Sequence, residues 1–423
     1  MNEVHDVVVV GGGSAGLAAA VTAARTGART LLLERYGYLG GMGTASLVHT
    51  FCGLYLLREE PGAVLANAGF ATEMAERMIA ATGLGPVRMG RVDVLPQHPV
   101  EFVRIADEIT AAESTLETLF HTEVLAVTRE DGVWRITLGG RGGMADVSAR
   151  ALVDASGDAV VAGFLGGGAE MTDSPGLQRP AYVFGVQGMT GFDDAARLHT
   201  AGWIVEGVRK GILPKSAMGL SFRASGRTGE IFGSLDLTGG ESTGHDPLDH
   251  VAFPHWSPVA RKIAGEVLRF LSHSSDGWRN AYISQWPVRA GVRESRRWIG
   301  GYVLTAEDLL EGRRFDDEIA LATWPMELRE TVKGPKLRYP QGNRPAGIPL
   351  RCLQPRGIPG LFVAGRCLSA DHEAQASIRV MGTCFATGGA AGKAAADSAR
   401  TDHFNLPSHH REMLGWVRDH PHR

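Results

Sequence analysis

The first forty residues alternate between short apolar runs and glycine-rich turns. Residues 7–10 are four consecutive valines, a pattern typical of a strand buried on both faces of a parallel sheet. The glycine-rich segment 11–16 leads into an alanine-rich run over 17–25, which favours a helix that ends before Gly27. A second apolar run follows over 30–33. Together these patterns predict a strand–helix–strand unit.

Further helix and strand patterns follow this unit. Periodic apolar residues predict helices over 71–81 and 100–112. The next apolar runs predict one strand and then a three-stranded antiparallel meander, with Gly and Asp at the turns. These runs cover residues 116–120, 123–128, 133–138 and 145–153.

The C-terminal half shows two different patterns. Residues 171–339 hold most of the Trp residues and predict long loops and short mixed strands, with one helix near 258–272. Residues 360–366 again predict a buried strand that ends in glycine, and 382–399 predict a helix rich in Ala and Gly. The histidine-containing tail from residue 402 has no ligand-like spacing and is interpreted as a solvated terminus.

Composition narrows the class of protein. The chain has 423 residues, of which 44% are hydrophobic and 21% charged, as in ordinary globular proteins. The net charge of −3 does not favour a nucleic-acid partner. A polar N-terminus and the lack of long apolar runs predict no signal peptide, no membrane contact and a cytoplasmic location. Four cysteines without CxxC spacing predict neither disulfides nor a structural metal. Oligomeric state is not indicated.

The strongest chemical signal is the spacing of Gly11, Gly13 and Gly16 between the first predicted strand and its helix. Gly11 permits a tight turn, Gly13 lets a diphosphate approach the helix N-terminus, and Gly16 allows close packing of helix and strand. Glu34 ends the second strand, where a carboxylate accepts hydrogen bonds from ribose hydroxyls and repels a 2′-phosphate. The segment therefore predicts a dinucleotide site.

Several segments identify the dinucleotide by resemblance. Residues 6–20 resemble the opening of the glutathione-reductase-like FAD superfamily, and 40–44 resemble its flavin-side glycine loop. Residues 361–384, 292–305 and 153–158 are similar to a family of FAD-dependent oxidoreductases within it. Gly382, Gly389 and the segment Glu327-Leu328-Arg329 depart from the pattern of relatives, which have Pro, Gln and an acid-x-His sequence at these places.

The resemblance implies an α/β fold with a discontinuous, Rossmann-type FAD-binding domain from residues 1–170 and 340–423. A second, smaller mixed α+β substrate domain is expected from residues 171–339. FAD, expected to be non-covalent, is expected to contact Gly11, Gly13, Ser14, Ala15, Gly16, Glu34, Arg35, Gly41, Met42, Thr44, Val124, Ala155, Ser156, Gly157, Gly365, Arg366, Gly382, Thr383 and Cys384.

Candidate catalytic residues are His372, Arg379 and Arg293. Arginine binds carboxylates in a bidentate manner, so Arg293 and Arg379 could hold an acidic substrate; interdomain ion pairs are the alternative for any single arginine. His372 could accept a proton during hydride transfer, or it could be held by structural contacts.

The predicted function is FAD-dependent oxidation of a small organic substrate, anionic if the arginines bind it. Hydride would pass to flavin N5, and the electrons would leave to oxygen or another acceptor, because no second dinucleotide fingerprint is present. Two alternatives stay open at this point: a flavin-dependent isomerase or lyase without net redox, and a non-catalytic flavin-binding protein.

Overall fold

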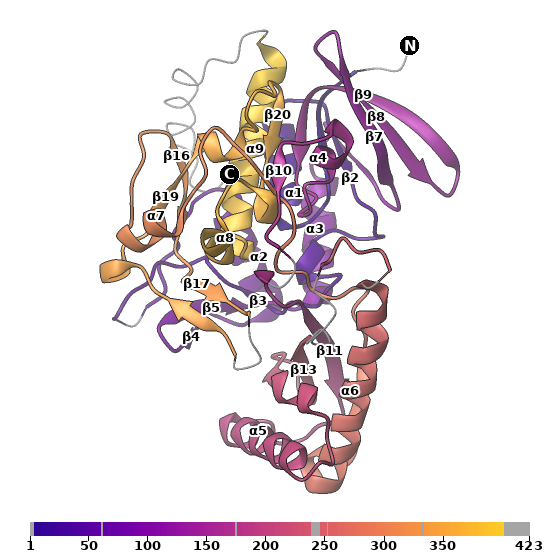
Figure 1. Cartoon of the computed structure of the whole chain (residues 1–423), viewed down its shortest axis with the longest axis vertical. Helices are drawn as coiled ribbons and strands as arrows, with labels where there is room; N and C mark the ends of the chain where they lie inside the picture. Colours follow the sequence, from indigo (N-terminus) through magenta and orange to yellow (C-terminus); the bar gives the residue numbers. More distant parts are fainter. Residues whose placement is uncertain are drawn as a thin grey trace.

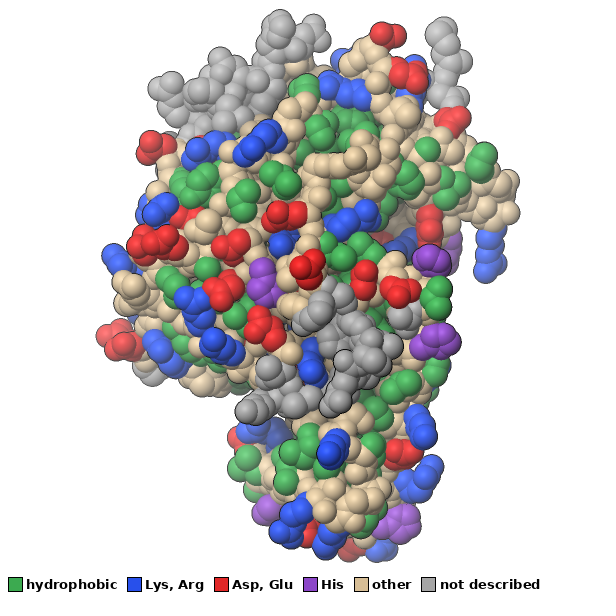
Figure 2. Space-filling model, viewed as in Figure 1, with side chains coloured by type: hydrophobic (Ala, Val, Ile, Leu, Met, Phe, Trp, Pro, Cys, Tyr) green, Lys and Arg blue, Asp and Glu red, His purple; other side chains and the backbone are tan. Residues whose placement is uncertain are grey.

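The computed structural model describes residues 4–60, 62–173, 176–237, 246–251, 253–330 and 334–401. The predicted solvated tail from residue 402 lies outside the described residues. Figure 1 shows a main body and a narrower unit that projects from it and carries helices α5 and α6. Figure 2 shows acidic and basic side chains interspersed over the visible face of both parts, in keeping with the small net charge.

The main body is built on a mostly parallel sheet. Its central strand, β1 (His5–Val10), pairs in parallel with β2 (Thr30–Leu33) on one side and with β9 (Gly143–Asp154) on the other. Strand β6 (Leu116–Leu119) extends the sheet beyond β2, and β20 (Leu361–Val363) pairs in parallel with the end of β9. The strand predicted over 360–366 thus returns to the N-terminal sheet.

The predicted antiparallel meander is continuous with this sheet. Strands β7 (Glu123–Glu130) and β8 (Val133–Gly140) pair in succession, and β8 pairs with the first half of β9. At Ala149 the pairing of β9 changes from antiparallel to parallel, because this residue lies opposite both Trp134 of β8 and His5 of β1. One long strand therefore joins the meander to the parallel sheet.

Two helices made largely of small residues pack against each other beside the sheet (Figure 1). Helix α1 (Ser14–Arg25) is buried along nearly its whole length, and it lies against α9 (Met381–Arg400). A methyl group on Gly392 would lie 2.0 Å from the carbonyl oxygen of Ala19. The absence of side chains at such positions lets the two backbones approach closely.

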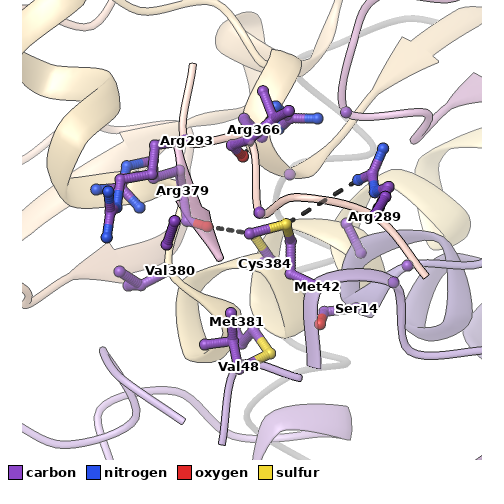
Figure 3. Close-up of a pocket in the computed structure, with 18 of the residues that line it drawn as sticks. Ser14, Met42, Val48, Arg289, Arg293, Arg366, Arg379, Val380, Met381 and Cys384 are labelled. Atoms are coloured by element: carbon purple, nitrogen blue, oxygen red, sulfur yellow. Dashed lines mark hydrogen bonds between the residues drawn. The ribbon is translucent and has the colours of Figure 1, made fainter. Parts of the chain in front are cut away.

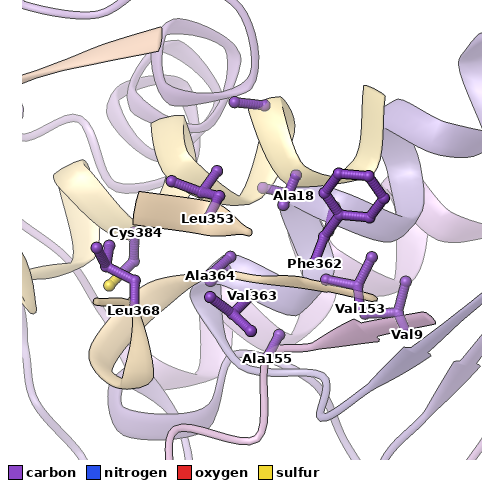
Figure 4. Packing of buried hydrophobic residues seen from close by; sticks show 14 of the residues in the cluster. Val9, Ala18, Val153, Ala155, Leu353, Phe362, Val363, Ala364, Leu368 and Cys384 are labelled. Atoms are coloured by element: carbon purple, nitrogen blue, oxygen red, sulfur yellow. The ribbon is translucent and has the colours of Figure 1, made fainter. Parts of the chain in front are cut away.

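Strand β20 lies at the centre of this packing. Figure 4 shows Phe362 and Val363 beside Val153 and Val9 of the neighbouring strands, with Ala18 of α1 close by. All five side chains are at most 2% exposed. Burying apolar side chains of this size is the main favourable contribution to folding. The buried contact holds the N- and C-terminal segments of the chain together.

The projecting unit has its own sheet and hydrophobic cluster. The antiparallel order is β12-β13-β11-β14, formed by Leu220–Ala224, Glu230–Asp236, Ala181–Gln187 and Tyr282–Gln285. Helices α5 (Asp194–Arg209) and α6 (Phe253–Ser274) pack beside this sheet. Only α6 is predicted by the sequence pattern, because α5 buries just Thr200, Ile204 and Gly207 and so lacks a broad apolar stripe.

The remaining elements cover the main body. Helices α2 (Phe70–Thr82) and α3 (Pro99–Ala111) agree with the two helices predicted in this region. The other elements are β3 (Thr50–Phe51), β4 (Val87–Met89), β5 (Val92–Pro96), α4 (Val160–Leu165), β10 (Ala169–Glu170), β15 (Arg297–Trp298), α7 (Ala306–Glu311), β16 (Glu318–Ala322), β17 (Met326–Leu328), β18 (Lys336–Arg338), β19 (Ala346–Pro349) and α8 (His372–Ile378).

The predicted α/β, Rossmann-type fold is confirmed by the parallel order β6-β2-β1-β9 with α1 connecting β1 to β2. The division of the chain at residues 171 and 339 stays a prediction; Trp298 and Leu304 belong to the hydrophobic cluster of the main body. Within the described residues, no helix has the length and apolar character needed to cross a membrane.

Candidate functional site

One cavity of about 410 Å³ extends from the turns at the ends of the parallel strands to the sheet of the projecting unit. Most residues predicted to bind the cofactor or the substrate line it. These are Gly11, Gly13, Ser14, Ala15, Glu34, Arg35, Gly41, Met42, Val124, Ala155, Ser156, Gly157, Arg293, Gly365, Arg366, Arg379 and Cys384. Figure 3 shows Arg293 and Arg379 on one side of Met42 and Cys384, and Arg289 on the other.

The first end of the cavity is formed by the N-terminus of α1. Gly13 precedes this helix, and no side chain caps its free N–H groups. A methyl group on Gly13 would meet only the Cα of Gly41, at 3.9 Å, so the space in front of the helix is open. Uncapped N–H groups and the helix dipole attract anions. This end can therefore hold a phosphate group.

Glu34 lies beside the helix N-terminus and is 5% exposed. Its Oε2 accepts a hydrogen bond from the Gly12 N–H at 2.7 Å, and its Oε1 accepts one from the Tyr36 N–H at 2.9 Å. Burial raises the pKa of the Glu34 carboxyl, although both hydrogen bonds and nearby arginines oppose the shift. Each carboxylate oxygen keeps a further lone pair for a hydroxyl group in the cavity.

Arginines surround the same end. Arg366 donates to Asp158 at 2.8 Å, and Arg35 lies 3.8 Å from the other oxygen of that carboxylate. Burial alone would raise the pKa of Asp158, but Arg366 and two other arginines lower it to about 2. Arg289 has a buried Nε without a hydrogen-bond partner among the described residues, and burial lowers its pKa.

These features fit the diphosphate of a dinucleotide. Three guanidinium groups, those of Arg35, Arg289 and Arg366, lie near the carboxylate of Asp158. A diphosphate would supply acceptors for the N–H groups of α1 and for the unpartnered Nε of Arg289. Arg289 is not among the residues that the sequence predicts to contact the cofactor.

The second end of the cavity carries another charged cluster. Asp236 of β13 accepts from Arg293 at 2.8 Å and from Arg329 at 2.6 Å. Arg329 also donates to Glu327 at 2.8 Å, and the Trp324 indole donates to the other Glu327 oxygen at 3.1 Å. Burial favours protonation of both carboxyls, but the arginine charges dominate and lower the pKa of each. The segment Glu327-Leu328-Arg329, where relatives have an acid-x-His sequence, thus places an ion pair in the cavity wall.

Arg379 lies where α8 ends and also lines this part of the cavity. Burial lowers the pKa of its guanidinium to about 10, so it is charged at neutral pH. Arg223 of β12 lines the cavity as well, and no sequence motif pointed to it or to Asp236. Their strands, β12 and β13, pair in the projecting unit. Four arginines and two acids line this end of the cavity: Arg223, Arg293, Arg329, Arg379, Asp236 and Glu327.

His49 is a second residue that no motif indicated. Its ring stacks on Phe232, with centroids 4.7 Å apart, and it lines the cavity. Burial lowers the pKa of His49 to about 4, so the ring is neutral at pH 7. Its Nδ1 lies 3.4 Å from the Leu47 carbonyl, and its buried Nε2 has no partner among the described residues. The Nε2 is therefore an unused hydrogen-bonding atom in the cavity wall.

The cavity cysteines are thiols rather than thiolates at neutral pH. Burial raises the pKa of Cys52 and of Cys384 to about 12 in each case. The Cys384 thiol donates to the Arg379 carbonyl at 3.2 Å. Neither cysteine has the lowered pKa that activates a nucleophilic thiol.

Four residues expected at the cofactor do not line the cavity. Gly16 serves the predicted packing role, because a methyl group there would lie 1.7 Å from the Gly11 carbonyl oxygen. The Thr44 hydroxyl donates to the Leu39 carbonyl at 2.7 Å and so holds the loop. Gly382 packs closely against Gly53, because a methyl group on Gly382 would lie 2.5 Å from the carbonyl carbon of Gly53. Thr383 is fully buried beside it.

His372 also lies off the cavity wall. Its Nδ1 lies 2.8 Å from Glu294 and its Nε2 lies 2.9 Å from Glu330. The hydrogen bond to Glu294 is the main reason that the pKa of His372 rises to about 9. Both ring nitrogens are occupied and the ring is protonated at neutral pH. The geometry therefore favours the structural alternative over the predicted proton acceptor.

Replacing His372 is expected to reveal this structural role through the pH dependence of stability. The folded-state pKa lies above the ordinary value of 6.5, so the stabilisation is complete below pH 6.5 and is lost as the pH rises through about 9. Because the ring is partly exposed, we expect His372→Gln to lower the free energy of unfolding by about 1–2 kcal/mol at pH 6. Urea unfolding from pH 6 to 10 measures the effect.

The exposed His199 on α5 provides the control for this prediction. His199→Gln should leave stability unchanged across the same pH range. A deficit in His372→Gln that is as large at pH 10 as at pH 6 would contradict the assignment of a protonated, ion-paired ring.

Comparisons with known proteins agree with this site. A family model described as "FAD dependent oxidoreductase" matches residues 6–405. Uncharacterised proteins of Mycobacterium tuberculosis and Mycobacterium bovis are each 36% identical to the chain over 98 residues, which is 21% of this chain and 18% of the relative. The match thus covers less than a fifth of the length of these relatives.

Two solved structures show a distant likeness. A myxobacterial chondrochloren halogenase is 13% identical, with 98% of this chain and 79% of that chain covered and a TM-score of 0.49. A geranylgeranyl bacteriochlorophyll reductase-like protein from Thermoplasma acidophilum is 12% identical, with 99% and 84% covered and a TM-score of 0.47. At these values, neither likeness bears on the substrate of this chain.

Proposed function

The chain belongs to the FAD dependent oxidoreductase family, and from this premise we propose that it oxidises a small organic anion. FAD is its cofactor, and bound flavin accepts a hydride at N5 and passes the electrons on to oxygen or another acceptor. The main support is the single cavity that joins the N-terminus of α1 to the cluster of four arginines and two acids.

In this proposal the first end of the cavity binds the nucleotide part of FAD. The N–H groups at the start of α1 and the Arg289 guanidinium would bind the diphosphate. Glu34 would accept hydrogen bonds from ribose hydroxyls, and Val124 at the start of β7 would contact the adenine. The cavity lining and the open space at Gly13 support these roles.

The second end would bind and orient the substrate. Arginine stays charged when it is partly buried and forms short, directional hydrogen bonds with carboxylates. Arg293 is already paired with Asp236, so its proposed role is to hold the cluster in place and add positive potential. Arg379 has no carboxylate partner among the described residues and is the proposed direct contact.

The polar groups that converge on this end disfavour a non-catalytic flavin-binding protein. Arg223, Asp236 and Arg329 all come from the region 171–339 and face one cavity. Charged groups are costly to remove from water, and a protein that only stores flavin would gain nothing from placing them together here. An isomerase or lyase would use the same groups, so an experiment is needed to distinguish these activities from the proposed oxidation.

The test is anaerobic reduction of the FAD-loaded protein by candidate substrates. We expect at least one small organic acid to bleach the flavin absorption without any added reductant, and oxygen or an artificial acceptor to restore it. Turnover of an acid with no acceptor consumed would favour the isomerase or lyase. If no organic anion reduces the flavin and none is turned over, the proposed oxidation is wrong.

Arg379→Ala is expected to separate substrate binding from cofactor binding. Removing the guanidinium should weaken binding of the reducing acid by roughly 10- to 100-fold, the usual value of a buried charge-assisted hydrogen bond. FAD content should be unchanged, because the diphosphate end does not involve this residue. The measurement is the concentration dependence of anaerobic flavin bleaching, with FAD content taken from the absorption spectrum. Unchanged affinity for every acid would exclude Arg379 as the contact.

A further inference from the structure

Two arginines of the cavity lack a carboxylate partner among the described residues. Arg223 donates to the Sδ of Met89 at 3.2 Å, a weak acceptor. Arg379 donates to the Gln178 side-chain oxygen at 3.3 Å and to the Glu327 carbonyl at 3.5 Å, and its Nε is buried without a partner. Each guanidinium therefore has unused capacity for a strong acceptor.

The other two arginines of the cluster are fully committed. Arg293 and Arg329 share the carboxylate of Asp236, and Arg329 also binds Glu327. With four guanidinium groups and two carboxylates, the cluster keeps two positive charges in excess. Burial is the main reason that the pKa of Arg223 and of Arg379 is lowered; Glu327 opposes the shift at both arginines, and Arg329 adds to it.

The two unpaired arginines reach the cavity from different elements. Arg223 is on β12 of the projecting sheet, and Arg379 follows α8 in the main body. Apolar side chains line the same cavity, including Val94 of β5 and Val183 of β11. Two separate cations with apolar walls match a molecule that has two anionic groups joined by a hydrocarbon segment.

From this arrangement we propose that the substrate is a dicarboxylate, with one carboxylate on Arg223 and the other on Arg379. The inference rests on the proposed function and makes its substrate class specific. A monocarboxylate would compensate one cation and leave the other without an anionic partner, whereas a dicarboxylate provides an acceptor for both guanidinium groups. A phosphate monoester carries its charges on oxygens of a single phosphorus and could not reach two arginines on separate elements equally well.

The experiment compares dicarboxylates with monocarboxylates of equal chain length on the FAD-loaded protein. Succinate, glutarate and adipate are titrated against butyrate, valerate and hexanoate, with inorganic phosphate as a third probe, by calorimetry and by changes in the flavin spectrum. We expect one of the dicarboxylates to bind at least ~10-fold more tightly than its monocarboxylate counterpart and than phosphate.

Variants assign the two contacts. Arg223→Gln and Arg379→Gln should each weaken dicarboxylate binding by roughly 10- to 100-fold, down to the affinity of the monocarboxylate, while FAD content stays at the wild-type value. Arg227→Gln is the matched control, because Arg227 lies just beyond β12 and pairs with Glu101 outside the cavity. It should bind every probe as the wild type does.

Equal affinities for dicarboxylates and monocarboxylates, or a loss in Arg223→Gln that is the same for both, would overturn the dicarboxylate assignment. The proposed oxidation would still stand if a monocarboxylate then reduced the flavin under anaerobic conditions. It would fail separately if no organic anion reduced the flavin, whatever the binding data show.

Discussion

Gly13→Val is expected to yield a folded protein that retains little or no FAD. A side chain at residue 13 has room within the protein itself, since its Cβ would meet only the Gly41 Cα at 3.9 Å, and the backbone there does not require glycine. The added side chain would instead fill the space in front of α1, where the diphosphate is proposed to bind. We expect FAD to bind at least ~100-fold more weakly, measured as FAD content and by titration with added FAD.

Gly142→Val is the matched control for this substitution. Gly142 lies in the turn between β8 and β9, and a methyl group there would have no heavy atom within 4 Å. This variant should keep its FAD, and circular dichroism should show that both variants are folded. Normal FAD content in Gly13→Val would refute the proposed diphosphate site at the start of α1.

Gly392→Ala is expected to have the largest effect on stability. Its Cβ would lie 2.0 Å from the Ala19 carbonyl oxygen of α1, and neither backbone can move without separating the two helices. Overpacking of a well-packed core typically costs about 1–3 kcal/mol, and a clash between two backbones belongs at the upper end of this range. We therefore expect the free energy of unfolding to fall by about 3 kcal/mol. Because α1 carries the proposed diphosphate site, FAD content should fall as well.

Gly389→Ala, three positions before Gly392 on α9, provides the contrast. Its Cβ would be 3.4 Å from the Thr22 hydroxyl, a contact that a small rotation relieves. Alanine favours helix by about 1 kcal/mol over glycine, so this variant should be as stable as the wild type or slightly more so. Thermal unfolding of the two variants measures the difference; equal melting temperatures would contradict the close approach of α1 and α9.

The parts of the fold that could be predicted from the sequence are those with local causes. The valine run of β1, the glycines after it and Glu34 all lie within residues 7–34, and the structure confirms the strand–helix–strand unit that they predict. The distinct packing role of Gly16 also followed from its spacing, and its contact with Gly11 confirms it. In each case, the residues that determine the feature lie within one short segment.

The charged end of the cavity could not be predicted in this way. His49, Arg223 and Asp236 lie in segments without a motif, and only the pairing of β12 with β13 and the stacking of His49 on Phe232 place them at one cavity. His372 shows the opposite case. The sequence left a proton acceptor and a structural residue both open for His372, and Glu294, 78 residues away, occupies its Nδ1. Long-range contacts decided both outcomes.

The most direct test of the account is a difference absorption spectrum of the FAD-loaded protein titrated with small carboxylates in the absence of oxygen. If one cavity holds both the cofactor and the anion-binding arginines, at least one carboxylate should change the flavin bands in a saturable manner, through perturbation or bleaching. Arg379→Ala, which should keep its FAD, should lose that response at the same concentrations. A flavin spectrum that no carboxylate alters, or an alteration that Arg379→Ala leaves unchanged, would contradict the account.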